Sequence, residues 1–76
     1  MTPTDIEALI LAGMPGSTAR VSSDDNTHFE AVVVSTEFAG KRPLQRHQMI
    51  YATLGEKMGG EIHALSIQAL TPDEQG

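Results

Sequence analysis

One amphipathic helix, expected over residues 43–58, does most to limit what this chain can fold into. Side chains suited to a core recur within it at steps of three and four residues, which on an α-helix gathers them on one face. They are Leu44, His47, Ile50, Tyr51, Leu54 and Met58. Such a face must pack on other apolar surface, so the segments on either side of the helix decide the fold.

The segments that flank this helix are typical of β-strands. Residues 28–35 are rich in valine, and residues 62–70 alternate between apolar and polar side chains. Strand, helix and strand in this order form a crossover unit, so the two strands are expected to be parallel with the helix on one face. Both strands then start at the same end of the sheet. We therefore expect His28 and His63, which open them, to lie close together.

Two more elements are expected before the crossover unit. A first helix should begin at residues 4–7, where Thr-Asp-Ile-Glu matches a capping box, and end at Gly13. Residues 18–23 suggest a weak strand that the turn at 24–27 folds back antiparallel. The sequence thus predicts one α+β domain over residues 1–76, α-β-β-α-β, with a three-stranded mixed sheet, both helices on one face and a frayed tail at 71–76.

The composition narrows the classes of function. A chain of 76 residues buries too little apolar area for a large enclosed active site, so a function at a surface or an edge is expected. With no cysteine, its own metal ligands must be histidine or carboxylate. A net charge of −5 argues against sequence-independent nucleic-acid binding. Residues 1–12 show neither a basic leader nor a membrane-spanning run, which predicts a cytoplasmic protein that does not enter a membrane.

Several separated blocks of the sequence together form a specific pattern. They are Thr27-His28-Phe29-Glu30 with Val32-Val33-Val34-Ser35, Phe38-Ala39-Gly40-Lys41, Leu44-Gln45-Arg46-His47-Gln48-Met49-Ile50-Tyr51, Ile62-His63-Ala64-Leu65-Ser66-Ile67 and Thr71-Pro72. In content and order these blocks resemble the BolA family, and the resemblance runs from Asp24 to Pro72. It implies an αββαβ fold similar to type II KH domains, with a non-enzymatic role. The short loop before His28 is similar to that of the shorter family members.

The resemblance also implies a cofactor and a partner. Members of the family pair with monothiol glutaredoxins and share a [2Fe-2S] cluster with them, in iron signalling or cluster delivery. The family contributes the histidine of the third strand, which here is His63. A cysteine or histidine in the loop between the first two strands often adds a second ligand, whereas residues 24–27 here offer Asp-Asp-Asn-Thr and leave His28 as the candidate. Some members are described as DNA-binding regulators.

Each candidate ligand has a structural alternative. Alternation places His63 on the face of Leu65 and Ile67, where a lone histidine is more often a partly buried structural residue, and only the family resemblance reverses that preference. Histidine ligation generally raises the potential of a [2Fe-2S] centre above that of all-thiolate ligation. For His28, a second ligand and a ring that merely tops its strand are equally favoured. The two rings can share an ion only if they project to the same face.

His47 is interpreted as structural, within the core stripe of the central helix. It lies at the opposite end of the crossover unit from the other two histidines, so a three-histidine zinc site is not expected.

Three of the five basic residues, Lys41, Arg42 and Arg46, lie near the start of the central helix. They suggest a surface for a phosphate, an acidic partner or the carboxylates of glutathione, with a solvated basic turn as the alternative. Few aromatic side chains are available to stack on bases, and there is no Gly-x-x-Gly loop like that of KH domains.

The leading hypothesis is an adaptor in iron–sulfur cluster trafficking or in iron, redox or stress regulation. It would complete a bridging [2Fe-2S] cluster through His63 on a monothiol glutaredoxin with glutathione, and the isolated chain would be a monomer without a cluster. The rival is a KH-like DNA- or RNA-binding transcriptional regulator. A third possibility is a structural helper that binds no metal.

Overall fold

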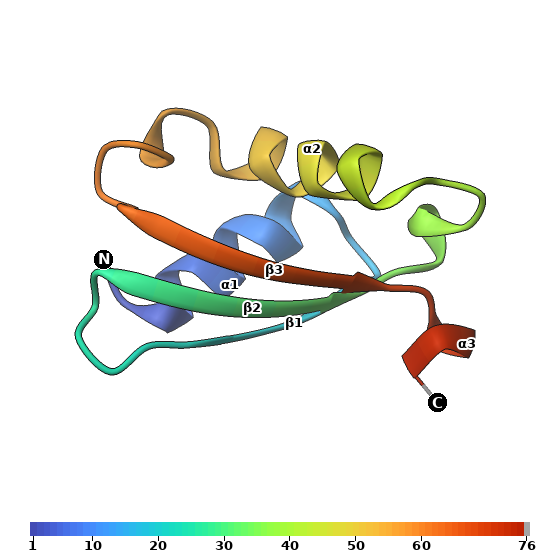
Figure 1. Ribbon diagram of the computed structural model, residues 1–76, viewed down its shortest axis with the longest axis horizontal. Helices are drawn as coiled ribbons and strands as arrows, with labels where there is room; N and C mark the ends of the chain where they lie inside the picture. The colour runs from blue at the N-terminus through green and yellow to red at the C-terminus, as the bar shows by residue number, and fades with distance from the viewer. Residues whose placement is uncertain (76) are drawn as a thin grey trace.

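The computed structural model describes residues 1–75. The predicted α+β class and α-β-β-α-β order are confirmed, with two 3₁₀ turns and a short C-terminal helix in addition (Figure 1). The elements are α1 (Pro3–Gly13), β1 (Thr18–Ser22), β2 (His28–Val34), η1 (Thr36–Phe38), α2 (Pro43–Leu54), η2 (Gly55–Lys57), β3 (Ala64–Leu70) and α3 (Pro72–Gln75).

The sheet has the order β1-β2-β3, with β1 antiparallel and β3 parallel to the central strand. Helix α1 packs beside β1 and helix α2 beside β3, and the two helices contact each other (Figure 1). Because side chains from both helices and from one face of β2 join in a single core, both helices cover the same face of the sheet. This is the arrangement that the crossover pattern predicts.

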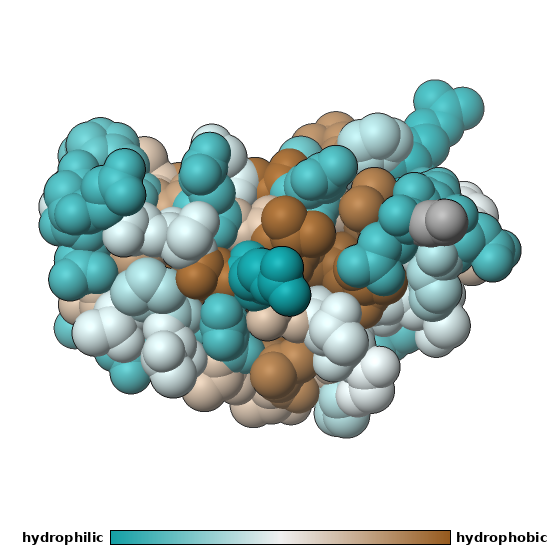
Figure 2. All heavy atoms as spheres, turned by 90° about the horizontal axis from the view of Figure 1, so that it is seen from below, coloured by the Kyte–Doolittle hydropathy of each residue, from teal (hydrophilic) through white to brown (hydrophobic). Residues whose placement is uncertain are grey.

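The covered face is apolar because β2 alternates. Phe29, Ala31 and Val33 point to the helices and are buried, while the residues between them point to the open face. Figure 2, a view from below, shows apolar side chains in the middle of the surface and hydrophilic ones toward both ends. The core cluster consists of Ile6, Ile10, Met14, Val21, Phe29, Ala31, Val33, Phe38, Ile50, Leu54 and Ile62.

The capping box of the first helix begins at Thr2, two residues earlier than predicted. Thr2 is the N-cap: its Oγ1 accepts the backbone N–H of Asp5 at 3.3 Å, and Asp5 Oδ2 accepts the N–H of Thr2 at 2.9 Å. Pro3 suits the first helical position because it has no N–H to satisfy. Glu7, expected to cap the helix, instead accepts a 2.8 Å hydrogen bond from the N–H of Val21 in β1.

The central helix is shorter than predicted. It ends at Leu54 because Gly55 adopts a φ of 54°, and the chain then makes the turn η2. The third strand consequently starts at Ala64, after an isolated bridge between Met58 and Ile62.

Two residues of the predicted core stripe lie outside the core. Leu44 is 69% exposed and Tyr51 is 38% exposed. They are seven residues apart and so share a side of the helix, whereas Ile50 and Leu54 form the buried side.

The predicted frayed tail is instead a helical turn. Thr71 Oγ1 accepts the N–H of Glu74 at 3.4 Å, and Glu74 Oε1 accepts the N–H of Thr71 at 2.9 Å, so the two residues cap α3 reciprocally. Gly76, the last residue of the expected tail, lies outside the described residues. None of the helices in the described part of the chain has the length and apolarity needed to span a bilayer.

Candidate functional site

Two exposed histidines meet at the end of the sheet where β2 begins. His28 is the first residue of β2, and His63 immediately precedes Ala64, the residue that pairs with His28 in the parallel register. Their ring centroids lie 5.9 Å apart, with the ring planes at 89°. The predicted proximity is confirmed. It follows from the crossover connection, which returns the chain to the end of the sheet at which β2 started.

His63 is more accessible than strand alternation predicts. Residue 63 lies outside β3, which starts at Ala64, so the partly buried position that alternation favours for His63 is not observed. Ile62 occupies the buried position at this end and is fully enclosed, while His63 is exposed. The His63 imidazole is therefore accessible to another molecule.

The His28 ring is held by the turn that precedes it. Asp25 Oδ2 lies 2.9 Å from His28 Nδ1, and Asp25 Oδ1 accepts the backbone N–H groups of Thr27 and His28, each at 2.9 Å. These hydrogen bonds, that of the His28 N–H foremost, hold the pKa of Asp25 well below its usual range. The His28 side chain is nevertheless 68% exposed. The turn thus orients the ring without covering it.

The two rings lie near the separation that one shared ion needs. With metal–nitrogen distances of about 2.0–2.1 Å, two imidazoles on one tetrahedral ion have centroids about 5 Å apart, compared with 5.9 Å here. No group of three or more histidine, aspartate or glutamate side chains within residues 1–75 is arranged to hold a metal ion. The pair therefore offers two nitrogens and, within residues 1–75, no third ligand of its own.

His47 stands apart from this pair. It is half-buried in α2, one turn before the fully buried Ile50. Helix α2 starts at the end of the sheet where β2 and β3 finish, which is the end opposite the two exposed histidines (Figure 1). This location agrees with the prediction that His47 shares no metal with them.

Arg46 does not share an exposed surface with Lys41 and Arg42. Its side chain is 11% exposed, and its guanidinium donates to the carbonyls of Lys41 at 2.9 Å and Ala69 at 3.0 Å. Two further bonds reach Glu74, at 2.6 and 3.1 Å. Arg46 therefore links α2, β3 and α3, and its expected binding role stays a prediction.

The remaining basic residues and the histidine pair occupy opposite ends of the sheet. Lys41 and Arg42 are exposed in the loop after η1, beyond the end of β2, while His28 opens that strand. A strand of seven residues spans roughly 20 Å. The basic residues Lys41 and Arg42 are thus a candidate surface separate from the histidine pair.

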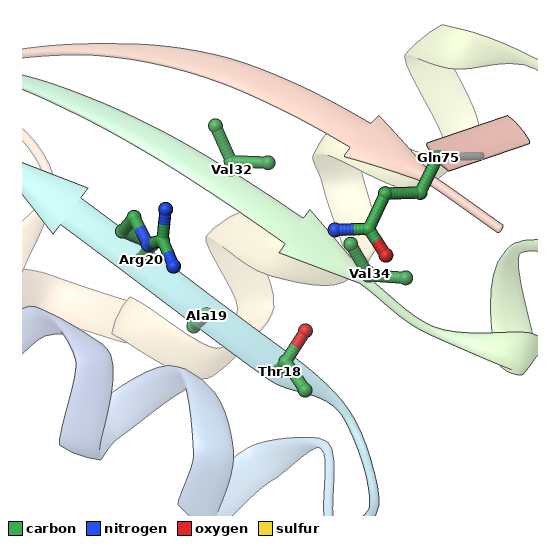
Figure 3. A pocket seen from close by; sticks show the side chains of 6 residues that line it. All are labelled: Thr18, Ala19, Arg20, Val32, Val34 and Gln75. Atoms are coloured by element: carbon green, nitrogen blue, oxygen red, sulfur yellow. The ribbon is translucent and has the colours of Figure 1, made fainter. Parts of the chain in front are cut away.

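A shallow hollow on the open face was not singled out by the sequence. Figure 3 shows side chains from β1, β2 and α3 around it, with Gln75 reaching toward Val34. Neighbouring hollows continue past Glu30 and Ser66 to His28, so the open face is grooved along its length. The sequence gives little indication of this hollow, because polar and apolar residues alternate along the strands that line it and form no motif. The first hollow is lined by Thr18, Ala19, Arg20, Val32, Val34 and Gln75.

Comparison with known proteins identifies the family. A family model described as BolA-like protein matches residues 12–74. Human BolA-like protein 1 is 48% identical over 66 residues, which cover 87% of this chain and 47% of that protein. The DNA-binding transcriptional regulator BolA of Escherichia coli strain K12 is 43% identical over 54 residues, 71% of this chain and 51% of that protein. The chain spans about half the length of these curated relatives.

Solved structures agree with the sequence match. A bolA protein homologue from Coxiella burnetii superposes with a TM-score of 0.89 at 41% identity, covering 99% of this chain and 96% of that chain. BolA1 from Arabidopsis thaliana superposes with a TM-score of 0.79 at 28% identity, covering 95% and 93%. From its blocks of sequence, its fold and these matches, the chain belongs to the BolA-like protein family.

Proposed function

We propose that this protein is a non-enzymatic adaptor that binds a monothiol glutaredoxin, together with glutathione, and completes a bridging [2Fe-2S] cluster. The observation that supports the proposal most is the pair of exposed imidazoles, His28 and His63, whose centroids lie 5.9 Å apart at one rim of the sheet. A rim is accessible to a second protein, whereas a site enclosed by the core is not.

The ligand count fits this proposal. A [2Fe-2S] cluster takes four protein ligands, and two histidines can replace two thiolates on one iron. His63 and His28 would supply two nitrogens, and the thiolates of glutaredoxin and glutathione would supply the other two positions. When bound, the cluster supplies one-electron chemistry, and imidazole ligation raises its potential relative to all-thiolate ligation. The chain's own part is to present and orient two neutral rings.

The test is a titration of the chain into a cluster-loaded monothiol glutaredoxin with glutathione, followed by visible absorption and circular dichroism. We expect wild type to change both spectra and His63→Ala to lose most of that change. His47→Ala is the matched control because it removes an imidazole at the other end of the sheet, and it should behave as wild type provided that its far-ultraviolet spectrum is native. Identical spectra for wild type and His63→Ala would remove His63 from the site.

A second candidate function is DNA binding through Lys41 and Arg42. Both side chains are exposed beside the start of α2, and the Escherichia coli relative is named a DNA-binding transcriptional regulator. With two exposed cations in this loop, the slope of log affinity against log salt should not exceed about 2 in magnitude. The measurement is fluorescence anisotropy with duplex and single-stranded probes, comparing wild type with a Lys41→Ser/Arg42→Ser variant. Flat curves at low salt would end this candidate.

A further inference from the structure

The turn before β2 carries a carboxylate whose contacts all converge on the start of the strand. Asp25 Oδ1 accepts the N–H groups of Thr27 and His28, each at 2.9 Å. The Ser23 hydroxyl donates its one proton to the carbonyl oxygen of His28 at 2.6 Å, and its oxygen lies 3.2 Å from Asp25 Oδ1. Two backbone hydrogen bonds on one oxygen fix the carboxylate against the turn, so its other oxygen has a defined position.

That second oxygen determines the chemistry of the His28 ring. Asp25 Oδ2 lies 2.9 Å from His28 Nδ1. An ionised carboxylate only accepts hydrogen bonds, so Nδ1 must carry the proton in this contact. In the neutral ring, Nε2 is then the nitrogen with a free lone pair. A carboxylate behind a ligating histidine is the common arrangement that orients such rings in metal sites.

We propose that Asp25 is a positioning residue that holds His28 in the Nδ1–H tautomer and aims Nε2 outward as the second nitrogen ligand. The consequence for a cluster rests on the function proposed above, whereas the tautomer is a property of the isolated chain. Sequence spacing supports the same contact, because Asp25 and His28 are three residues apart across a turn. Asp24, the neighbouring carboxylate, makes none of these contacts and so serves as the matched control.

The first test measures the tautomer directly in the isolated protein. Long-range ¹H–¹⁵N correlation spectra of the histidine rings at pH 8, where an ordinary imidazole is neutral, distinguish Nδ1–H from Nε2–H. We expect a predominant Nδ1–H form for His28 in wild type and in Asp24→Asn. In Asp25→Asn the amide oxygen can keep the backbone bonds, which leaves its NH₂ group facing Nδ1, so the ring should change to the Nε2–H form. Asp25→Ala should lose the Nδ1–H preference as well.

The second test measures the effect on cluster binding. Removing a partner behind a metal ligand typically weakens binding by 10–100-fold, so Asp25→Asn should need at least about tenfold more chain than wild type to reach the same dichroism change. Asp24→Asn should match wild type. An unchanged His28 tautomer in Asp25→Asn, or a titration equal to that of wild type, would overturn the inference. A changed tautomer with a wild-type chain that never alters the glutaredoxin spectrum would support the positioning of His28 and overturn the proposed function instead.

Discussion

Ile62 and His63 are neighbours in sequence but occupy opposite environments, and this difference can be measured. Ile62 is fully buried and His63 is exposed, although strand alternation alone predicts that His63 faces the core. Truncation of each side chain to alanine should therefore have unequal effects on the free energy of unfolding.

The expected size of the difference follows from burial. Ile62→Ala removes the equivalent of three methyl or methylene groups, a transfer loss of roughly 2.4 kcal/mol at about 0.8 kcal/mol per group, and the cavity left behind raises the cost to about 3 kcal/mol. A domain of this size has a total stability of roughly 4–11 kcal/mol, so the variant should stay folded or become marginal. His63→Ala, an exposed change, should stay within about 0.5 kcal/mol of wild type.

Urea unfolding followed by far-ultraviolet circular dichroism measures both variants. With a slope of about 1 kcal/mol per molar, Ile62→Ala should lower the midpoint by about 3 M. Ile62→Val, which removes one carbon, should cost about 1 kcal/mol and keeps the test quantitative if the alanine variant does not fold. If His63→Ala destabilises the protein more than Ile62→Ala does, the histidine is part of the core and the accessible rim does not exist.

Two further predictions concern contacts between secondary-structure elements. Gly13→Ala should lower stability by about 1 kcal/mol in thermal unfolding, despite better helix propensity, because a Cβ there would lie 2.6 Å from Thr53 Cγ2 in α2; an equal or higher melting temperature would show that the helices can separate. The side-chain bond from Arg46 and the N–H of Thr71 lower the pKa of Glu74 from 4.5 to about 2, so the stability it adds is present above about pH 4.5 and is lost as the pH falls toward 2. The gap in unfolding midpoint between wild type and Glu74→Gln should accordingly close over that range, and a gap independent of pH would contradict the ion pair.

The sequence was sufficient for the topology because its signals are periodic and ordered along the chain. A strand, a helix of more than ten residues and a second strand permit few arrangements, and the parallel one brings His28 and His63 together without any knowledge of side-chain contacts. The accessibility of His63 was not predictable in the same way. It depends on where β3 begins, and that point is set by the early end of α2 at Gly55 and the bridge of Ile62 with Met58.

Contacts between residues far apart in the sequence could not be predicted from it. Arg46 and Glu74 are 28 positions apart, so their pairing depends on α2 and α3 meeting at the end of β3. A local signal for α3 did exist, because Thr71-Pro72-Asp73-Glu74 has the same kind of capping pattern as Thr2-Pro3-Thr4-Asp5 at α1. In both cases a proline directly after the capping threonine marks the start of the helix.

The Asp25–His28 contact was also local, since the two residues are three positions apart in one turn. The sequence alone does not indicate it, because paired aspartates in a turn are usually solvated. Only the direction of the carboxylate separates Asp25 from Asp24.

The central claim, that two imidazoles of this chain complete a cluster held with a glutaredoxin, is tested most directly by magnetic resonance. The chain, labelled with ¹⁵N in its histidines, is mixed with cluster-loaded monothiol glutaredoxin and glutathione, the cluster is reduced, and electron–nuclear double resonance detects nitrogens bonded to iron. The account predicts two strongly coupled ¹⁵N nuclei in wild type and one in His28→Ala. In His63→Ala, which should lose most of the spectral change, most of the ¹⁵N coupling should be lost as well. A spectrum without strongly coupled ¹⁵N would contradict it.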